Sequence, residues 1–168
     1  ITSLDLYEQK LLKLANHARA LGISIIETRA ADARIFQPEQ QPGFILLDAP
    51  CSGSGVLGRR GELRWKLNGD KLRELTILQR ELLDHAATML RPEGIMVYAT
   101  CSVEPEENAL QMKSFLERHP EFEIDTDCSG LPERFRKEAE INGSLLTLPG
   151  DLPGFDGGFC QRFRKKPE

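Results

Sequence analysis

Short apolar runs alternate with longer amphipathic stretches along the whole chain. The runs rich in apolar or β-branched residues cover positions 1–5, 23–28, 44–48, 95–100 and 122–125. Runs of this kind favour β-strands, and we predict a strand for each. The run at 44–48 (FILLD) is apolar up to its last residue, which is typical of a strand in a parallel sheet that is covered on both faces.

The stretches between these runs carry apolar residues at three- and four-residue steps, which predicts amphipathic helices. We expect the first helix over residues 7–21, where Gly22 provides a stop. A second helix is expected over residues 72–89. A third is expected over about residues 105–119, which begin with a proline that suits a first helical turn.

The last part of the chain gives weaker signals. Residues 126–157 are rich in glycine, proline and charge and predict mostly loop, and the alternating sequence GFCQRFRK at 158–165 predicts a last edge strand. Because strand and helix alternate at least three times before this region, we predict an α/β fold with a parallel sheet and helices on both faces. Ligands of such sheets bind beyond the carboxyl ends of the strands.

Five acidic or nucleophilic side chains fall at or just after the predicted strand ends, namely Asp5, Asp32, Asp48, Cys51 and Cys101. Taken singly, each is ordinarily a loop carboxylate or a buried thiol. Because the carboxyl ends of parallel strands share one edge of the sheet, the five together predict a ligand site there. In particular, we expect Cys51 and Cys101 to meet across one cleft.

Two cysteines at one site suit chemistry on an electron-poor ring. A thiolate is a strong nucleophile once its pKa falls below ~8.5, and a helix N-terminus such as the one predicted after Cys101 can lower it. Carbon 5 of a pyrimidine is too unreactive to accept a methyl group directly, whereas a thiolate added at carbon 6 makes carbon 5 nucleophilic. Removal of the carbon 5 proton then lets the thiol leave, and a second polar group can assist that release.

Composition argues against several classes of function. The net charge of −4 argues against a protein that is basic over its whole surface. No apolar run approaches the ~20 residues of a membrane-spanning helix, and no secretory signal opens the sequence. The four cysteines stand far apart without a CxxC pair, which argues against a zinc site and a disulfide framework. We take Cys128 and Cys160 as incidental.

Two segments resemble the NOL1/NOP2/Sun family of RNA cytosine-5 methyltransferases, and most closely its bacterial branch that modifies 16S ribosomal RNA. They read LLDAPCSGSGVLGRR…LRWK and YATCSVEPEENALQMKSFLERHP, and the likeness covers most of the chain. The resemblance implies a Rossmann-like fold, S-adenosyl-L-methionine as cofactor, and methylation of carbon 5 of cytosine in RNA, with ribosomal RNA expected, through a covalent cysteine adduct at carbon 6. It also implies a cytoplasmic monomer without a metal or a membrane partner.

The resemblance assigns roles to the five residues at the strand ends. Cys101, in the TCS motif, is implied to be the nucleophile, and Cys51, in PCSGSG, is implied to assist release of the methylated product. Asp48 resembles the family aspartate between the cofactor and the cytosine. Asp5 resembles the acid that holds the ribose hydroxyls, and Asp32 the residue beside the adenine.

Positions 59–73 carry six basic and two acidic side chains, a local charge of +4. The basic residues are Arg59, Arg60, Arg64, Lys66, Lys71 and Arg73. Such a run is usually a solvated surface, but beside the cysteine loop it predicts phosphate contacts, with the first four of these residues as RNA-binding candidates. Trp65 either stacks on a base or packs within the protein. The basic residues at 162–166 either extend this patch or form a soluble tail.

The sequence departs from the family pattern at both ends. The first strand and glycine-rich turn of the family lie upstream of the matching position, no glycine here precedes Gly22, and the family's DGFF reads DGGFC. We therefore expect residues 1–168 to be an N-terminally truncated part of a catalytic domain that binds the cofactor weakly and is marginally stable alone. Two alternatives stay open: an inactive RNA-binding remnant, and a dithiol redox protein that uses Cys51 and Cys101.

Overall fold

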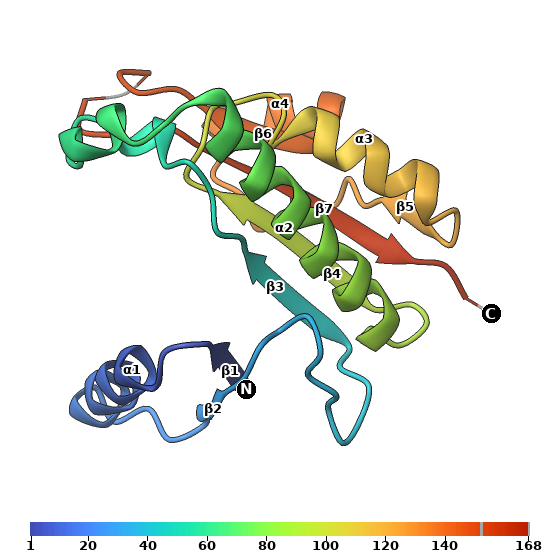
Figure 1. The fold of residues 1–168 in the computed structure, drawn as a ribbon. Helices are drawn as coiled ribbons and strands as arrows, with labels where there is room; N and C mark the ends of the chain where they lie inside the picture. Colours follow the sequence, from blue (N-terminus) through green and yellow to red (C-terminus); the bar gives the residue numbers. More distant parts are fainter. Residues whose placement is uncertain (152, 168) are drawn as a thin grey trace. The chain divides into compact units, whose positions relative to one another are not determined.

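The computed structural model describes residues 1–151 and 153–167, except for the side chains at 138 and 142. The chain divides into two compact units, Ile1–Glu39 and Gln40–Glu168, and each is described by itself (Figure 1). No helix among the described residues has the length and apolar character needed to cross a membrane.

The first unit is a strand–helix–strand motif. Strand β1 (Thr2–Asp5) leads into helix α1 (Glu8–Ala20), and strand β2 (Glu27–Ala30) then pairs with β1 in parallel. The predicted helix is confirmed, and its apolar stripe buries Leu11 and Ala18.

The second predicted strand, residues 23–28, is wrong in its first four residues. The ladder between β1 and β2 begins at the pair Thr2–Glu27, so residues 23–26, three of which are isoleucines, lie outside it, and Ile25 remains 64% exposed. β-propensity describes how well a residue fits a paired surface, and it does not form a strand without a partner.

The second unit contains a five-stranded mixed sheet. Its strands are β3 (Phe44–Asp48), β4 (Ile95–Thr100), β5 (Phe122–Ile124), β6 (Ser144–Thr147) and β7 (Gly158–Lys165). The order is β3-β4-β7-β5, and β6 also pairs with β7. The predicted strands at 44–48 and 95–100 are confirmed at both ends.

Strand β7 corrects the expectation of a largely parallel sheet with an edge strand at the C-terminus. Among the described strands of this sheet, β3 and β4 run parallel, whereas β7 runs antiparallel to β4, β5 and β6 and lies inside the sheet. Alternation in GFCQRFRK places Phe159 and Phe163 in the core and Arg162 on the opposite face. The alternation therefore reports two different faces of the sheet, and it says nothing about an edge.

Strand β3 is an edge strand of this sheet, and one of its two faces is exposed, which corrects the prediction that both faces are covered. Ile45 and Leu47 pack against the core, whereas Phe44 and Leu46 are 58% and 62% exposed. A run of apolar residues does not tell which of its faces another element covers.

Helices α2 (Gly69–Met89) and α3 (Ala109–Arg118) lie over the same face of the sheet (Figure 1). Asn68 caps α2 by accepting a hydrogen bond from the Lys71 backbone N–H at 2.9 Å, so the helix begins three residues earlier than its apolar stripe. Helix α3 begins four residues later than predicted because residues 105–108 form turns.

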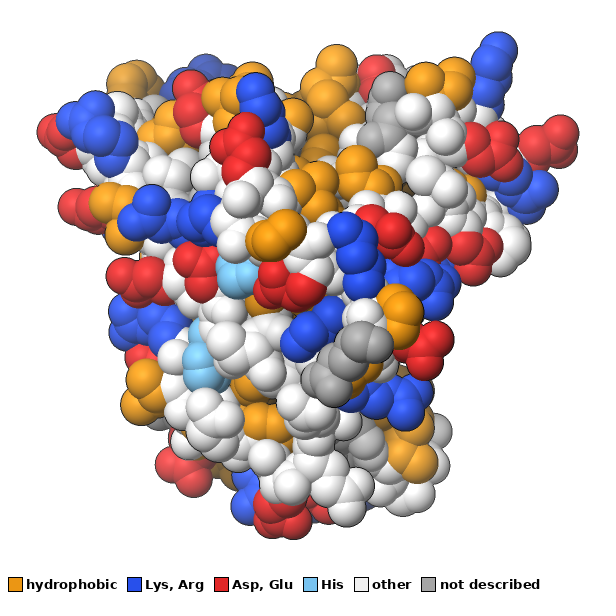
Figure 2. Space-filling model, turned by 90° about the vertical axis from the view of Figure 1, so that its right-hand side faces the viewer, with side chains coloured by type: hydrophobic (Ala, Val, Ile, Leu, Met, Phe, Trp, Pro, Cys, Tyr) orange, Lys and Arg blue, Asp and Glu red, His pale blue; other side chains and the backbone are white. Residues whose placement is uncertain are grey.

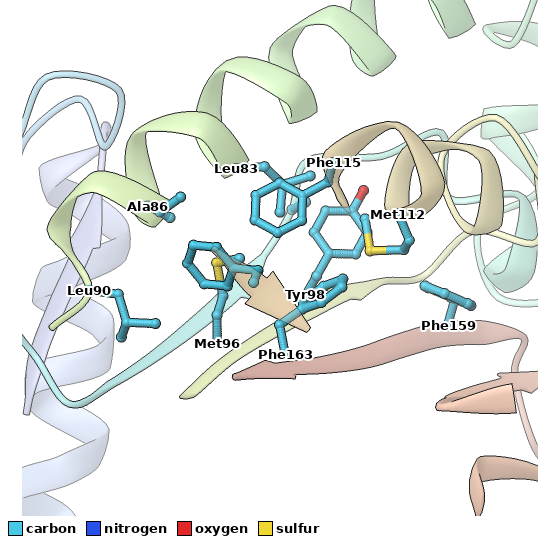
Figure 3. Close-up of a cluster of buried hydrophobic side chains, with 12 residues drawn as sticks. Leu83, Ala86, Leu90, Met96, Tyr98, Met112, Phe115, Phe159 and Phe163 are labelled. Carbon is cyan, nitrogen blue, oxygen red and sulfur yellow. The ribbon is translucent and has the colours of Figure 1, made fainter. Parts of the chain in front are cut away.

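The core of the second unit lies between these two helices and the sheet (Figure 3). Its largest fully enclosed apolar side chains are Leu83, Leu90, Met96, Tyr98, Met112, Phe115 and Phe163. The ring of Phe115 lies 5.2 Å from that of Phe122 and 5.1 Å from that of Phe163. Each such side chain contributes about 1.5–3 kcal/mol on burial, so this cluster fixes α2 and α3 on the sheet.

The region predicted as loop, residues 126–157, contains two elements that the sequence did not indicate. Helix α4 (Glu133–Asn142) ends at Gly143, whose φ of 65° is left-handed, and β6 follows it directly. No side chain caps the N-terminus of α4. Strand β6 depends on pairing with β7, and this long-range ladder leaves no local pattern.

Candidate active site

The two predicted cysteines lie side by side. Cys51 follows β3 and Cys101 follows β4, and because these strands are parallel neighbours their carboxyl ends share one edge of the sheet. The two Sγ atoms are 3.2 Å apart. The prediction that the thiols meet is therefore confirmed.

Close approach of three loops brings these thiols together. The Gly55 N–H donates to the Cys101 carbonyl at 3.1 Å, and the Gly157 N–H donates to the Gly55 carbonyl at 2.8 Å. A Cβ at Gly55 would collide with the backbone of both partners. Gly53, with φ of 71°, turns the cysteine loop through the left-handed region. The glycines therefore serve chain packing at the site.

The buried carboxylate of Glu107 holds the cysteine loop through hydrogen bonds that it accepts from Ser52. Glu107 is fully buried, and its Oε1 accepts hydrogen bonds from the Ser52 N–H and from Gln79 Nε2, both at 2.9 Å. Its Oε2 accepts the Ser52 hydroxyl at 2.6 Å. Three donors therefore compensate the desolvation of this carboxylate and fix the residue next to Cys51.

The same network reaches the second cysteine loop. The Ser102 hydroxyl lies 3.1 Å from that of Ser52 and 3.2 Å from that of Ser54. Asn108 donates to the Ser102 carbonyl at 2.9 Å and accepts from the Thr100 hydroxyl at 2.7 Å. Both loops are thus tied to the turns before α3.

Sequence reasoning missed Glu107, Gln79 and this serine cluster. Glu107 lies in the acidic stretch VEPEEN, where the sequence alone cannot separate a buried glutamate from its solvated neighbours. The sequence feature that could have indicated a buried polar site is the pair Glu107–Asn108, which directly precedes an amphipathic helix.

Burial and the neighbouring sulfur control the ionisation of Cys51. Burial, followed by the hydrogen bond with Cys101, raises the pKa of Cys51 to about 12. Cys51 therefore keeps its proton at neutral pH and can donate it in a hydrogen bond to the sulfur of Cys101, which is the more exposed of the two. Because α3 begins only at Ala109, Cys101 is not in its first turn, and the predicted help from that helix N-terminus is not found.

Two of the three predicted aspartates belong to the first unit. Asp5 is the last residue of β1, and Asp32 comes two residues after β2, which pairs with β1 in parallel. Asp5 accepts hydrogen bonds from the Tyr7 N–H at 2.8 Å and from Lys10 Nζ at 3.2 Å, and the Tyr7 bond in particular lowers its pKa. Both carboxylate oxygens of Asp32 accept hydrogen bonds from the Arg34 guanidinium, Oδ1 at 3.0 Å and Oδ2 at 2.6 Å.

The third aspartate, Asp48, ends β3 in the second unit. It pairs with Ala99 in the parallel ladder and precedes Cys51 by three residues. Its side chain is exposed and makes no hydrogen bond to a residue that the structure describes. Asp48 therefore stands at the same edge of the sheet as the two thiols with its lone pairs available.

The four candidate RNA-binding residues at 59–66 differ in whether they form ion pairs. Arg59 pairs with Asp156 at 2.9 Å, and Arg60 pairs with Glu62 at 3.2 Å. Arg64 and Lys66 form no ion pair within the described part of the chain. Trp65 is 86% exposed, so the packing role considered for it is not found here.

The basic residues near the C-terminus form neither an extension of this segment nor a tail. Arg162 and Arg164 belong to β7 and pair with the buried Asp125, at 3.3 and 2.9 Å. Lys165 Nζ donates to the Leu90 carbonyl at 2.8 Å, beyond the end of α2. These cations hold the sheet and its helix together. Figure 2 likewise shows basic and acidic side chains intermixed on one face of the molecule, in line with the net charge of −4.

Comparison with known proteins gives one family. The protein family described as 16S rRNA methyltransferase RsmB/F matches residues 1–159. The ribosomal RNA small subunit methyltransferase B of Escherichia fergusonii is 38% identical over 170 residues, which cover 99% of this chain and 37% of that protein. The chain thus spans little more than a third of the length of the curated relatives that it matches.

Solved structures show the same fold. A methyltransferase homolog protein from Pyrococcus horikoshii is 29% identical, with a TM-score of 0.78 over 98% of this chain and 53% of that one. NSun6 from Pyrococcus horikoshii, at 22% identity, has a TM-score of 0.77 over 100% of this chain and 42% of that one. The mixed α/β architecture of the two units is therefore that of a Rossmann-like methyltransferase.

Proposed function

The chain belongs to the 16S rRNA methyltransferase RsmB/F family, and on that premise we propose that it supplies the catalytic residues for methylation of carbon 5 of cytosine in RNA. The observation that carries this proposal is the contact of 3.2 Å between the Cys51 and Cys101 sulfurs at the carboxyl edge of β3 and β4. A pyrimidine needs covalent activation before carbon 5 can accept a methyl group, and a thiolate supplies it.

In this proposal Cys101 is the nucleophile because it is the more exposed thiol. Its sulfur forms a bond to carbon 6 of cytosine, and the electron pair of the carbon 5–carbon 6 double bond moves onto carbon 5. That carbon then has the electron pair needed to accept a methyl group. After methylation, loss of the carbon 5 proton to a base restores the double bond, and the carbon 6–sulfur bond breaks with its electron pair returning to sulfur.

Cys51 is suited to a second, different role. Its raised pKa keeps the proton on Cys51 Sγ at neutral pH. A protonated Cys51 can donate a hydrogen bond to the sulfur of Cys101, which stabilises negative charge there before addition and again when the sulfur leaves carbon 6. Ser52, held by Glu107, fixes the loop so that this contact persists.

S-adenosylmethionine, when bound, supplies an electrophilic methyl group, and the acidic residues fit parts of it unequally. The Asp5 side chain is 29% exposed and accepts two hydrogen bonds, so its remaining lone pairs can accept ribose hydroxyls. Asp48 has all its lone pairs available. Asp32 is engaged by Arg34, so its proposed position beside the adenine includes that guanidinium. We propose these three aspartates as the cofactor-binding residues.

RNA is the proposed partner, and the small-subunit ribosomal RNA the proposed substrate, because the curated relatives are ribosomal RNA small subunit methyltransferases. Arg64 and Lys66 are the basic residues best placed to contact phosphates, since Arg59 and Arg60 already pair with acidic side chains. Phosphate contacts of this kind add affinity without reading sequence.

A trapping experiment tests the nucleophile. RNA containing 5-fluorocytidine is incubated with S-adenosylmethionine and a longer protein that joins this chain to the family's first strand and glycine-rich turn, because the chain alone is expected to bind the cofactor weakly. Fluorine at carbon 5 cannot leave as a proton, so the adduct persists. We expect a covalent protein–RNA band for the longer protein without a substitution and for Cys51→Ala, and none for Cys101→Ala. Cys160→Ala is the matched control and should keep the band.

The same variants test release on ordinary RNA. Cys51→Ala should accumulate the adduct on unmodified cytosine because the leaving sulfur has lost its hydrogen-bond donor. A covalent band from Cys101→Ala, or its absence with the longer protein that carries no substitution, would contradict the proposal.

A further inference from the structure

One large aromatic side chain of the second unit stands in solvent. Trp65, the only tryptophan of the chain, is 86% exposed, more than any other exposed large apolar side chain of the described residues. It ends the short helix η2 (Gly61–Trp65), which lies between the cysteine loop and α2. A single exposed apolar side chain is ordinary on a protein surface, so the case for a partner depends on where this ring stands and on the charges around it.

The position of this ring relative to the cysteines is fixed by its neighbours. Leu63, two residues before Trp65, packs on Gly53, where a Cβ would lie 2.6 Å from Leu63 Cδ1. The Lys66 N–H donates to the Leu63 carbonyl at 3.0 Å and closes the turn that carries the indole. Trp65 therefore belongs to a short helix, η2, that contacts the loop of Cys51 through Leu63.

The charges around the ring select the chemistry of its partner. Ion pairs occupy Arg60, Lys71 and Arg73, through Glu62, Glu74 and Asp70 respectively. Arg64 and Lys66, the two residues that flank Trp65, form no ion pair within the part of the chain that the structure describes. Lys66 acts on Glu62 only through its charge, without an ion pair. An exposed indole between two cations that form no ion pair matches a chain of planar rings and phosphates, which is single-stranded nucleic acid.

We propose that Trp65 is a stacking platform for an unpaired base of single-stranded RNA, with Arg64 and Lys66 on the adjoining phosphates. This inference rests on the proposed function for the identity of the nucleic acid. The platform would hold a base near the target cytosine, because η2 adjoins the cysteine loop. Stacking is tolerant of base identity, so Trp65 would position the strand and leave the choice of nucleotide to other contacts.

The single tryptophan makes the test direct, because all tryptophan emission of the chain comes from Trp65. The chain is titrated, without methyl donor, with an oligocytidylate of about 10 nucleotides, a length within the usual site sizes of single-strand binders. A ribose-phosphate oligomer of equal length without bases is titrated in parallel. We expect saturable quenching of emission by the oligocytidylate and none by the abasic oligomer.

Variants separate stacking from charge, with binding followed by the anisotropy of end-labelled oligomers. Trp65→Ala should weaken binding of the oligocytidylate about 5- to 150-fold, leave the abasic oligomer unaffected, and be largely rescued by Trp65→Phe. The double change Arg64→Ala and Lys66→Ala should weaken both oligomers and reduce the salt slope by about 1.4. Ile141→Ala, which removes another exposed apolar side chain on α4, is the control and should change neither.

The outcomes are distinct from those of the trapping experiment. Two results overturn the stacking role of Trp65: equal quenching by both oligomers, or equal oligocytidylate affinity of Trp65→Ala and the unchanged chain. If the affinities are equal and the trapping experiment still gives a normal adduct, the stacking role is wrong and the proposed function stands. Base-dependent quenching that persists in Cys101→Ala supports the platform even if methylation fails. A Trp65 surface that serves another protein would leave emission unchanged with RNA, which also overturns the proposal.

Discussion

At the scale of single residues, Cys51 and Cys101 differ in burial although their sulfurs are in contact, and the pKa of Cys51 is raised. Burial is the first cause of the raised pKa of Cys51, and the hydrogen bond with Cys101 is the second. Cys101 lies at the surface. Two identical side chains 3.2 Å apart can therefore take the roles of proton donor and nucleophile, because the protein desolvates only one of them strongly.

This difference predicts the order of alkylation. Because burial raises the pKa of Cys51 to about 12 and Cys101 is the more exposed thiol, iodoacetamide should label Cys101 first and Cys51 only as the pH rises well above 9. Peptide mass spectrometry after timed labelling between pH 7 and 11 measures both rates. In urea the two rates should converge; a Cys51 rate in the folded chain that already levels off near pH 9 would show that burial does not raise its pKa.

At the scale of elements, Glu107 joins α2, the cysteine loop and the turns before α3. It does so through Gln79 and Ser52, without a cationic partner among the described residues. A carboxylate in this position organises donors from segments that are distant in sequence. Removal of the Glu107 carboxylate would leave the Ser52 N–H buried without an acceptor. Gln79 Nε2 would not lose its last acceptor, because it also donates to the Pro50 carbonyl.

We expect Glu107→Ala to lower the free energy of unfolding by about 1–3 kcal/mol for the orphaned donor, with a further loss for the cavity. Urea denaturation followed by circular dichroism measures this. Glu106→Ala, at the exposed neighbouring position, is the matched control and should stay within about 0.5 kcal/mol of the unchanged chain. Equal midpoints for the two variants would mean that the network around Glu107 contributes little to stability.

At the scale of the whole molecule, the two units differ in how much structure supports each strand. The first unit has a two-stranded sheet with four paired residues in each strand. The second places β4 and β7 inside a five-stranded sheet under a continuous core. Two-stranded sheets are marginal in water, whereas central strands under a packed face are among the most stable parts of a fold.

Hydrogen exchange should reveal this difference. Amides of β4 and β7 should exchange at least about 100-fold more slowly than those of β1 and β2, a difference of about 2.7 kcal/mol in opening free energy. Mass spectrometry of peptic peptides gives the comparison, and exchange in urea provides the unprotected reference. Uniform protection across both units would instead indicate that they open together.

The sequence by itself determined the features that depend on local pattern. Apolar runs defined β3 and β4 to the residue, and three- and four-residue spacing located α1 and α2. Because parallel strands end at one edge, the positions of Cys51 and Cys101 after two such runs were enough to predict that the thiols meet. The cysteine motifs also indicated the family that the comparisons then confirmed.

Only the tertiary structure decided what depends on contacts between distant segments. The interior position of β7 and the existence of β6 follow from ladders that join residues 144–147 and 158–165 with other strands. The burial of Glu107, the pairing of Arg59 with Asp156 and the exposure of Trp65 likewise follow from which surfaces meet. The same side chain can be solvated or buried with equal local sequence, so its environment, and with it its charge state and its chemistry, is fixed only when the chain has folded.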